Sequence, residues 1–567
     1  MNFFLITEIN KFPKKEIERL VKCKTLEFIF DGYTCYFNEE EKFKKDRVVI
    51  NELNIKIFLN GVILNKEELS YNDEKWESTI LRLYSECGID FVKQLNGSFN
   101  GFVYDPSNTQ LDVFNDHIGS KPIYYKKDES LISTKISLLY DLLSYSERGP
   151  TLSVESAYCL LSYGFMLDAL TLSNEILKLS PGSLFNNQIK KITAYYTLDN
   201  TPDISITKND AIEIIDDSFQ KALKQQFNKD VEYGYKHLVG LSGGLDSRMT
   251  AVVANELGFT EQTNFTFSQS DYLDETIAKK ISSDLRHNWI FKHLDNGLFL
   301  KKLDEITEIS GGSVLYYGLA HGQSLYELLN FSGFGLVHTG QLGDVVVGTF
   351  YSDNKFSKSY KAGDGALSKT FANKVSLNVL GREYPNQEVF NFYNRGFSGA
   401  NSGLASIQNY SETMSPFYQI EMLNNALKIP ACHRYGHRLY QEWILSKHSF
   451  AAKYKWEKTG QRLTAKTFDI NGKAFTVKQI LGIATRKVFG VDFNDVGSKN
   501  HMNPFEYWYK TNLSLNAFIE DYYILNINRV EDYELKKDVM DLFSNGTVLN
   551  KLQVISLLSA IKRFFNK

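Results

Sequence analysis

The stretch HLVGLSGGLDSRMTAVVANELG (residues 237–258) joins an apolar run to a helical pattern through a Gly-Gly turn. HLVGL (237–241) predicts a buried strand, and MTAVVANELG (249–258) predicts a helix that stops at its terminal glycine. Between them lies S-G-G-L-D-S (242–247). Glycines let the backbone approach a ligand closely, and the N–H groups of a loop and a helix N-terminus attract anions. The stretch therefore predicts a phosphate-binding loop between a strand and a helix.

Asp246 in this loop indicates that a metal ion accompanies the phosphate. No lysine follows the glycines, so the loop is not a Walker P-loop. A carboxylate repels a bare phosphate, whereas Mg²⁺ between the two would bind both. The alternative is an ordinary strand-to-helix turn with Asp246 as the N-cap.

A second acid is expected at the same place. GLVHTGQLGDVVVGTF (335–350) is again a strand followed by a glycine-containing turn and Asp344. Ligands of open α/β sheets lie at the carboxyl ends of the strands. Asp344 is therefore predicted to share the magnesium with Asp246, the alternative being an aspartate that only stabilises its turn.

The order of elements around this loop predicts a parallel, doubly wound α/β sheet. A long helix is expected over 208–227, strands over 263–268, 289–294 and 333–340, and a helix over 274–285. From about residue 411 the pattern is mostly helical.

The N-terminal part is rich in strand patterns. IKIFLNGVILN (55–65) predicts a hairpin that turns at Asn-Gly, and KWESTILRLYSECG (75–88) predicts a helix. A polar stretch over 186–205 predicts a boundary, which gives one domain over 1–200 and a second over 206–567, with a helical extension from about 455.

Composition excludes several classes of protein. A chain of 567 residues is too long for a single hydrophobic core, so two or more domains are expected. The net charge of -3 and the lack of a basic block argue against a nucleic-acid partner. The five cysteines form no CxxC pair, which favours a reducing compartment. No apolar run is long enough to cross a membrane and no signal peptide is apparent, so a cytoplasmic location is expected.

Several motifs, in the same order, resemble the asparagine synthetase family. LSGGLDS (241–247) is similar to its pyrophosphatase loop, and TGQLGD (339–344) resembles its S-G-E-G-S-D. FNDHIGSKPIYY (114–125) resembles R-D-x-x-G-x-K-P-L-Y-Y, and ETMSPFYQIEML (412–423) resembles the stretch with V-P-F-L-D. The likeness covers about the first 450 residues.

The resemblance implies an N-terminal Ntn-hydrolase-like (class II glutamine amidotransferase-like) β-sandwich with helices. It also implies a C-terminal adenine-nucleotide α-hydrolase-like (PP-loop) synthetase domain, which adenylates a carboxylate with Mg²⁺ and ATP before a nitrogen nucleophile displaces AMP. Asp246 and Asp344 would hold the magnesium. The residues implied in nucleotide binding are Leu241, Ser242, Gly243, Gly244, Leu245, Asp246, Ser247, Phe267, Thr339 and Gly340.

The glutaminase half departs from the family at three positions that contact glutamine. Asn2 stands where the family has its nucleophilic cysteine, and an amide cannot form a thioester. Val62 and Asn96 stand where the family has acids. The resemblance therefore predicts a domain that no longer hydrolyses glutamine.

The synthetase half departs as well. Gln341 replaces a glutamate that steers amide formation in the family. The family's catalytic lysine aligns with Glu442, near Arg434, Arg438 and Lys447. Arg438 is the candidate to supply the missing charge and completes the catalytic set with Asp246, Asp344 and Gln341, whereas the alternative is an exposed helix of mixed charge.

The predicted function is an ATP-dependent, AMP-forming amide ligase that uses ATP and Mg²⁺. Its partner would be a small-molecule or glycan-precursor carboxylate, because MNPFEYWYKTN (502–512) resembles asparagine-synthetase-like proteins encoded with surface-polysaccharide genes. The nitrogen would be free ammonia, ammonia from a separate protein, or a substrate amine, as in β-lactam synthetase and lasso-peptide cyclase.

Two alternatives stay open. The departures at Gln341 and at the lysine position favour a catalytically silent nucleotide-binding scaffold, which two retained metal acids argue against. A glutamine-dependent asparagine synthetase would need a nucleophile that the sequence does not show.

Overall fold

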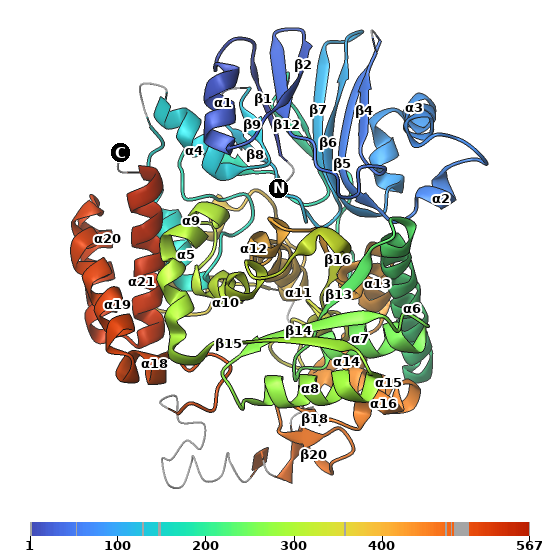
Figure 1. Cartoon of the computed structure of the whole chain (residues 1–567), viewed down its shortest axis with the longest axis vertical. Helices are drawn as coiled ribbons and strands as arrows, with labels where there is room; N and C mark the ends of the chain where they lie inside the picture. The colour runs from blue at the N-terminus through green and yellow to red at the C-terminus, as the bar shows by residue number, and fades with distance from the viewer. Residues whose placement is uncertain are drawn as a thin grey trace.

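The N-terminal part of the computed structural model is built on two six-stranded antiparallel sheets (Figure 1). The structure describes residues 3–52, 54–127, 130–145, 149–356, 359–470, 473–477, 479–480 and 498–565. The first sheet has the order β10 (Ile176–Lys178), β8 (Tyr124–Lys126), β9 (Ile132–Ser133), β1 (Phe4–Glu8), β3 (Tyr33–Phe37) and β2 (Leu26–Phe30). The second has the order β12 (Lys191–Ala194), β11 (Ser183–Asn186), β7 (Gln110–Asn115), β6 (Gly97–Asp105), β5 (Lys56–Ile63) and β4 (Val48–Asn51).

Aromatic side chains fill the space between these sheets. The rings of Phe4 and Phe58 lie 5.8 Å apart, and those of Phe30 and Phe102 lie 5.7 Å apart, so residues of both sheets share one core. The helix α3 (Trp76–Cys87), predicted over 75–88, packs on the outer face of the second sheet. The helices α1 (Lys14–Val21), α4 (Ile136–Tyr145) and α5 (Val154–Tyr163) cover the first.

The hairpin predicted at Asn60 and Gly61 is wrong, because both residues lie inside the continuous strand β5. Gly61 pairs with Phe99 of β6, and a Cβ atom on it would lie 2.1 Å from the carbonyl oxygen of Ser98. Its φ of 141° also disfavours a side chain. The glycine therefore serves a close approach of two strands and not a turn.

A five-stranded sheet lies below the sandwich, and all its pairs are parallel, as predicted (Figure 1). Its order is β15 (Asn288–His293), β14 (Gln262–Ser268), β13 (Lys236–Gly240), β16 (Phe334–His338) and β17 (Thr413–Met414). One face is covered by α6 (Lys208–Glu232), α7 (Asp246–Glu256), α8 (Leu273–Leu285), α13 (Ile420–Lys428) and α15 (Arg438–Lys447). The other is covered by α10 (Tyr317–Tyr326) and α12 (Ala405–Gln408). Because the strands are parallel, their carboxyl ends and the loops that follow share one edge.

The C-terminal helices pack on both halves of the chain. They are α18 (Phe505–Thr511), α19 (Leu513–Asn526), α20 (Tyr533–Asn545) and α21 (Val548–Ala560). The helix α21 contacts α5 of the N-terminal part and α9 (Leu303–Ser310) beside the parallel sheet, within one hydrophobic core. Arg563 adds a bidentate ion pair with Asp141 of α4, with N–O distances of 2.9 and 3.0 Å. The tail is thus held against both halves of the chain.

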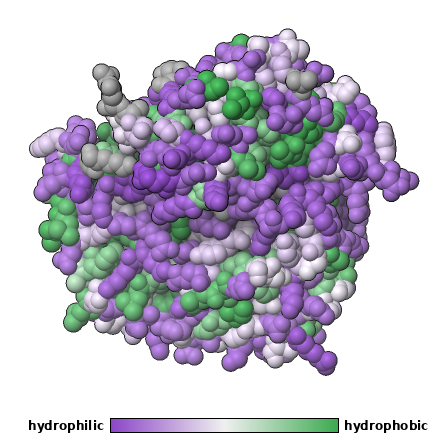
Figure 2. Space-filling view, turned by 45° about the horizontal axis from the view of Figure 1, so that its top comes forward, coloured by the Kyte–Doolittle hydropathy of each residue, from purple (hydrophilic) through white to green (hydrophobic). Residues whose placement is uncertain are grey.

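No helix among the described residues is both long and apolar enough to cross a membrane. The face shown in Figure 2 is largely hydrophilic, with hydrophobic residues in separate groups. All five cysteines are free thiols.

A buried ion pair joins the sandwich to the parallel-sheet half. The carboxylate of Asp46 is fully buried, lies 3.2 Å from the Nζ atoms of Lys229 and Lys66, and accepts hydrogen bonds from Ile63 N–H and the Tyr233 hydroxyl. Lys229 is itself 3% exposed.

We expect Asp46→Ala to lower the free energy of unfolding by about 3 kcal/mol, because the buried ammonium of Lys229 keeps only its pair with Glu232, and Ile63 N–H and the Tyr233 hydroxyl lose their acceptor. Urea denaturation of the variant measures this change. The matched control is Asp90→Ala, which removes the exposed Asp90–Lys93 pair at 2.7 Å and should cost less than about 1 kcal/mol. Equal losses in the two variants would contradict the role of Asp46.

Candidate functional site

Two cavities lie at the edge where β13, β14 and β16 end. The first has a volume of about 910 Å³, in the range that buries a nucleotide-sized ligand. Its wall combines the predicted loop, the ends of β14 and β16, and the tail. The lining residues are Gly240, Leu241, Ser242, Gly244, Ser247, Phe265, Thr266, Phe267, Tyr272, Asp274, Tyr326, Thr339, Gly340, Glu457, His501, Met502, Asn503, Pro504, Phe505, Glu506, Thr547 and Leu549.

Hydrogen bonds to two serine hydroxyl groups within the loop stabilise the loop between β13 and α7. Ser242 N–H donates to the Ser247 hydroxyl at 3.0 Å, and Gly244 N–H donates to the Ser242 hydroxyl at 3.2 Å. Gly243 N–H donates to a carboxylate oxygen of Asp274 at 2.7 Å. No described side chain caps the N-terminus of α7. That helix end therefore directs its partial positive charge toward the cavity region.

Gly340 and Gly343, in the turn that follows β16, allow this turn to lie in close contact with the loop between β13 and α7. A Cβ atom on Gly340 would lie 2.3 Å from the Ser247 nitrogen, and one on Gly343 would lie 2.7 Å from Cγ of Asp246. The same approach lets Asp344 N–H donate to a carboxylate oxygen of Asp246 at 3.0 Å. The structure thus brings Asp246 and Asp344 together from separate strands.

The paired acids suit a divalent cation. Burial, with a further contribution from the charge of Asp344, raises the pKa of Asp246 to about 8. A bound Mg²⁺ would offset this cost for Asp246, since carboxylate oxygens are its preferred protein ligands. Burial also raises the pKa of Asp274 to about 6, although the hydrogen bond from Gly243 opposes the shift.

Most residues predicted to bind nucleotide face the first cavity. Leu241, Ser242, Gly244, Ser247, Phe267, Thr339 and Gly340 line it. Gly243, Leu245 and Asp246 lie behind this lining, where Gly243 contacts Asp274 and Asp246 contacts the second motif. Gln341 lies outside both cavities and donates from its amide to the carbonyl of Ala400 at 3.0 Å.

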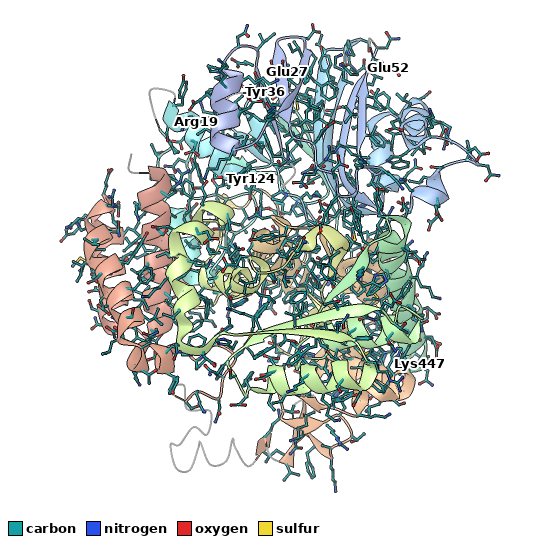
Figure 3. All side chains as sticks on the ribbon, in the orientation of Figure 1. Arg19, Glu27, Tyr36, Glu52, Tyr124 and Lys447 are labelled. Carbon is teal, nitrogen blue, oxygen red and sulfur yellow. The ribbon has the colours of Figure 1, made fainter. Side chains whose placement is uncertain are left out.

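The charged residues proposed around the missing lysine do not line either cavity. Arg438 begins α15 outside both, and Arg434 is buried in a bidentate pair with Glu388 at 2.9 and 3.0 Å. Glu442 pairs with Lys208 on the outside of the molecule. Lys447 pairs with Glu213 at 2.6 Å and lies at the outer edge of the view (Figure 3).

A second cavity, of about 920 Å³, adjoins Asp344. The turn after β18 (Lys455–Trp456) separates it from the first cavity. Glu457 in this turn lines the first cavity and donates from its backbone N–H to the carbonyl of Gly243 at 3.1 Å, whereas Trp456 and Lys458 line the second. The positive charge of Lys458 acts on Asp246, lowering its pKa against the larger effect of burial. Lys458 is thus a cation of the described residues whose charge reaches Asp246.

Sequence reasoning missed Asp274, Glu457, Lys458 and the tail segment over 501–506. Asp274 carried a usable signal, because it follows β14 at the same sheet edge as the other loops. Lys458 had none, since its distance from the loop along the chain gives no periodic pattern. The tail segment was noted only for its resemblance, which did not place it at the first cavity.

Two of the positions at which the sequence departs from the glutaminase pattern can be located in the structure. Val62 is fully buried with Phe43, Leu336 and Met414, and the half-buried Asn96 borders a small space of about 30 Å³. Asn2 lies outside the described residues.

Part of the chain is similar to known proteins. The family profile described as "Glutamine amidotransferase domain" matches residues 46–196. A putative glutamine-hydrolyzing asparagine synthetase of Methanocaldococcus jannaschii is 26% identical over 279 residues, which are 46% of this chain and 53% of that protein. Asparagine synthetase B of Escherichia coli is 28% identical over 211 residues, 35% of this chain and 32% of that protein. The chain thus spans about half of the first relative and a third of the second.

Among solved structures, glutamine phosphoribosylpyrophosphate amidotransferase from B. subtilis covers 51% of this chain and 84% of its own at 10% identity, but its TM-score of 0.23 supports no inference. The family profile covers part of the sandwich and ends before the strands that carry the site. Over up to about half of its length, the chain is similar to asparagine synthetases.

Proposed function

We propose that the chain is an ATP-dependent ligase that activates a carboxylate as an acyl-adenylate and transfers it to ammonia or an amine. One observation carries the proposal: Asp246 and Asp344 meet between a nucleotide-sized cavity and a second cavity of similar volume. We also propose that residues 1–200 form a glutaminase-like domain and 206–567 a PP-loop synthetase domain.

The first cavity suits ATP along its whole length. Phe265, Phe267 and Tyr326 give it an aromatic wall that an adenine ring can pack against. The hydroxyls of Ser242 and Ser247 and the start of α7 lie where phosphates would bind. Asp246 and Asp344 would hold Mg²⁺, which neutralises charge on the phosphates when it is bound.

Lys458 is the group of the chain that we assign to the first chemical step. An oxygen of the acceptor carboxylate attacks the α-phosphorus, and the bond to pyrophosphate breaks. Lys458 is placed to neutralise charge that develops on the phosphoryl oxygens. Ammonia or an amine then attacks the acyl carbon, the bond from this carbon to the AMP oxygen breaks, and the nitrogen loses a proton to solvent. An amide forms, and AMP departs with the oxygen that it gained from the carboxylate.

We expect Lys458→Ala to lower kcat for pyrophosphate release about a hundredfold while KM for ATP changes little, because the charge acts in the transition state. Lys458→Arg should restore part of the rate. The control is Lys453→Ala, a nearby exposed lysine that lines neither cavity. A kcat for Lys458→Ala within threefold of wild type would exclude this role.

Ammonia supplied from outside the chain is the proposed nitrogen source, or an amine of the acceptor. The buried Val62 and the small space at Asn96 support this choice. The test is pyrophosphate release from Mg·ATP with a panel of carboxylates, each with ammonium or with glutamine. Turnover with ammonium alone is the expected result. Turnover driven by glutamine would contradict the loss of the glutaminase, and ATP binding without pyrophosphate release for every acceptor would favour a silent scaffold.

A further inference from the structure

The second cavity is larger than an amino acid requires. Its volume of about 920 Å³ lies near the top of the range of about 300–1,000 Å³ for pockets that enclose drug-sized ligands. Aspartate would leave most of this space to water. A ligand that fills the space would be held in one orientation toward Asp344, as efficient transfer requires.

Besides Lys458, three basic side chains of the described residues line the second cavity. Lys361, Lys369 and Arg395 line it from two separate segments, and none of the three forms an ion pair within the described part of the chain. Arg395 lies over the ring of Phe350, with its guanidinium carbon 5.8 Å from the centroid. These cations remain available for an anionic group of a ligand.

The cavity is also lined by acids, but none of those that the structure describes forms an ion pair with these three cations. Asp353 accepts a hydrogen bond from Lys355 N–H at 2.9 Å, and Asp364 accepts one from Lys361 N–H at 3.0 Å, so both take part in turns of the cavity wall. Asp344 faces Asp246.

Aromatic rings and amides make up much of the remaining wall. A sugar has an apolar ring face and polar edges, and this combination of side chains matches both. The residues concerned are Phe350, Tyr351, Tyr435, Trp456, Gln387, Asn391 and Gln441.

We infer that the acceptor is a sugar acid that carries a phosphate group, an inference that rests on the proposed ligase function. Its carboxylate lies toward Asp344 and Lys458, its ring contacts the aromatic wall, and its phosphate binds Lys361, Lys369 and Arg395.

Calorimetric titration of the full chain without nucleotide tests this inference separately from catalysis. The probes are L-aspartate and the gluco, galacto and manno uronic acids, each as the free acid and as the 1-phosphate, with UDP-glucuronic acid as a nucleotide-linked form. We expect at least one phosphate-bearing acid to bind about tenfold or more tighter than its free acid and than aspartate. A failure of pyrophosphate release would leave this result unchanged and would count only against the ligase.

The double variant Lys361→Ala/Arg395→Ala should weaken the phosphate-bearing acid about tenfold and leave the free acid nearly unchanged. Lys355→Ala, an exposed lysine of the same region that does not line the cavity, is the control. Binding of aspartate as tight as that of every phosphorylated acid, or equal losses in the double variant and the control, would overturn the inference.

Discussion

Asp246→Asn is expected to lower pyrophosphate release from Mg·ATP at least about a hundredfold. The amide keeps the shape of the side chain and the acceptor for Asp344 N–H at 3.0 Å. It removes the charge that a divalent cation needs, at a position where burial and a second carboxylate already raise the pKa to about 8. The rate is measured with a coupled pyrophosphate assay at saturating ATP and magnesium.

Asp271→Asn is the matched control, since Asp271 is an exposed acid near the first cavity that does not line it. Thermal unfolding of both variants establishes that each is folded. Activity of Asp246→Asn close to that of the control would mean that the acid pair does not hold the catalytic metal.

Gly340→Ala is expected to remove activity and to destabilise the fold. The added methyl group would lie 2.3 Å from the Ser247 nitrogen and 2.4 Å from the carbonyl carbon of Asp246, both backbone atoms that cannot rotate away. The second motif must therefore move away from the loop, which separates Asp344 from Asp246. Overpacking of this kind costs about 1–3 kcal/mol.

The unfolding free energy of this variant is compared with that of Gly333→Ala, which lies just before β16 and has open space around its added Cβ. The control should change stability by less than about 1 kcal/mol and retain activity. A fully active Gly340→Ala would show that the close contact of the two motifs is not needed.

Local sequence patterns were sufficient for the parallel sheet. The alternation of apolar strands with amphipathic helices depends only on neighbouring residues, so β13, α7, β14 and α8 appear where they were predicted. The glycines of 242–247 and 339–344 also marked the two loops that meet at the site, because a close backbone approach requires them.

Local sequence patterns do not predict the structure where a contact with a residue far away in the sequence determines it. Asn60 and Gly61 have the composition of a turn, yet the contact of Gly61 with Ser98 holds them in a strand. Lys458 stands beside the acid pair because its turn binds Gly243 through Glu457, a contact between residues far apart in the sequence. Alignment by short motifs pointed instead to Glu442, whose side chain pairs with Lys208.

The tail shows the same limit of local patterns. Its helices were predictable, but its contribution to the first cavity depends on how α21 docks against α5 and α9.

The fate of oxygen during turnover tests the formation of an acyl-adenylate most directly. Wild-type protein is incubated with Mg·ATP, ammonium and an acceptor whose carboxylate carries ¹⁸O, and AMP, pyrophosphate and phosphate are analysed by mass spectrometry. One ¹⁸O atom in AMP and none in pyrophosphate is the expected result, absent in Asp246→Asn. Formation of ADP with ¹⁸O in inorganic phosphate, or of AMP without the label, would contradict activation of the carboxylate as an adenylate.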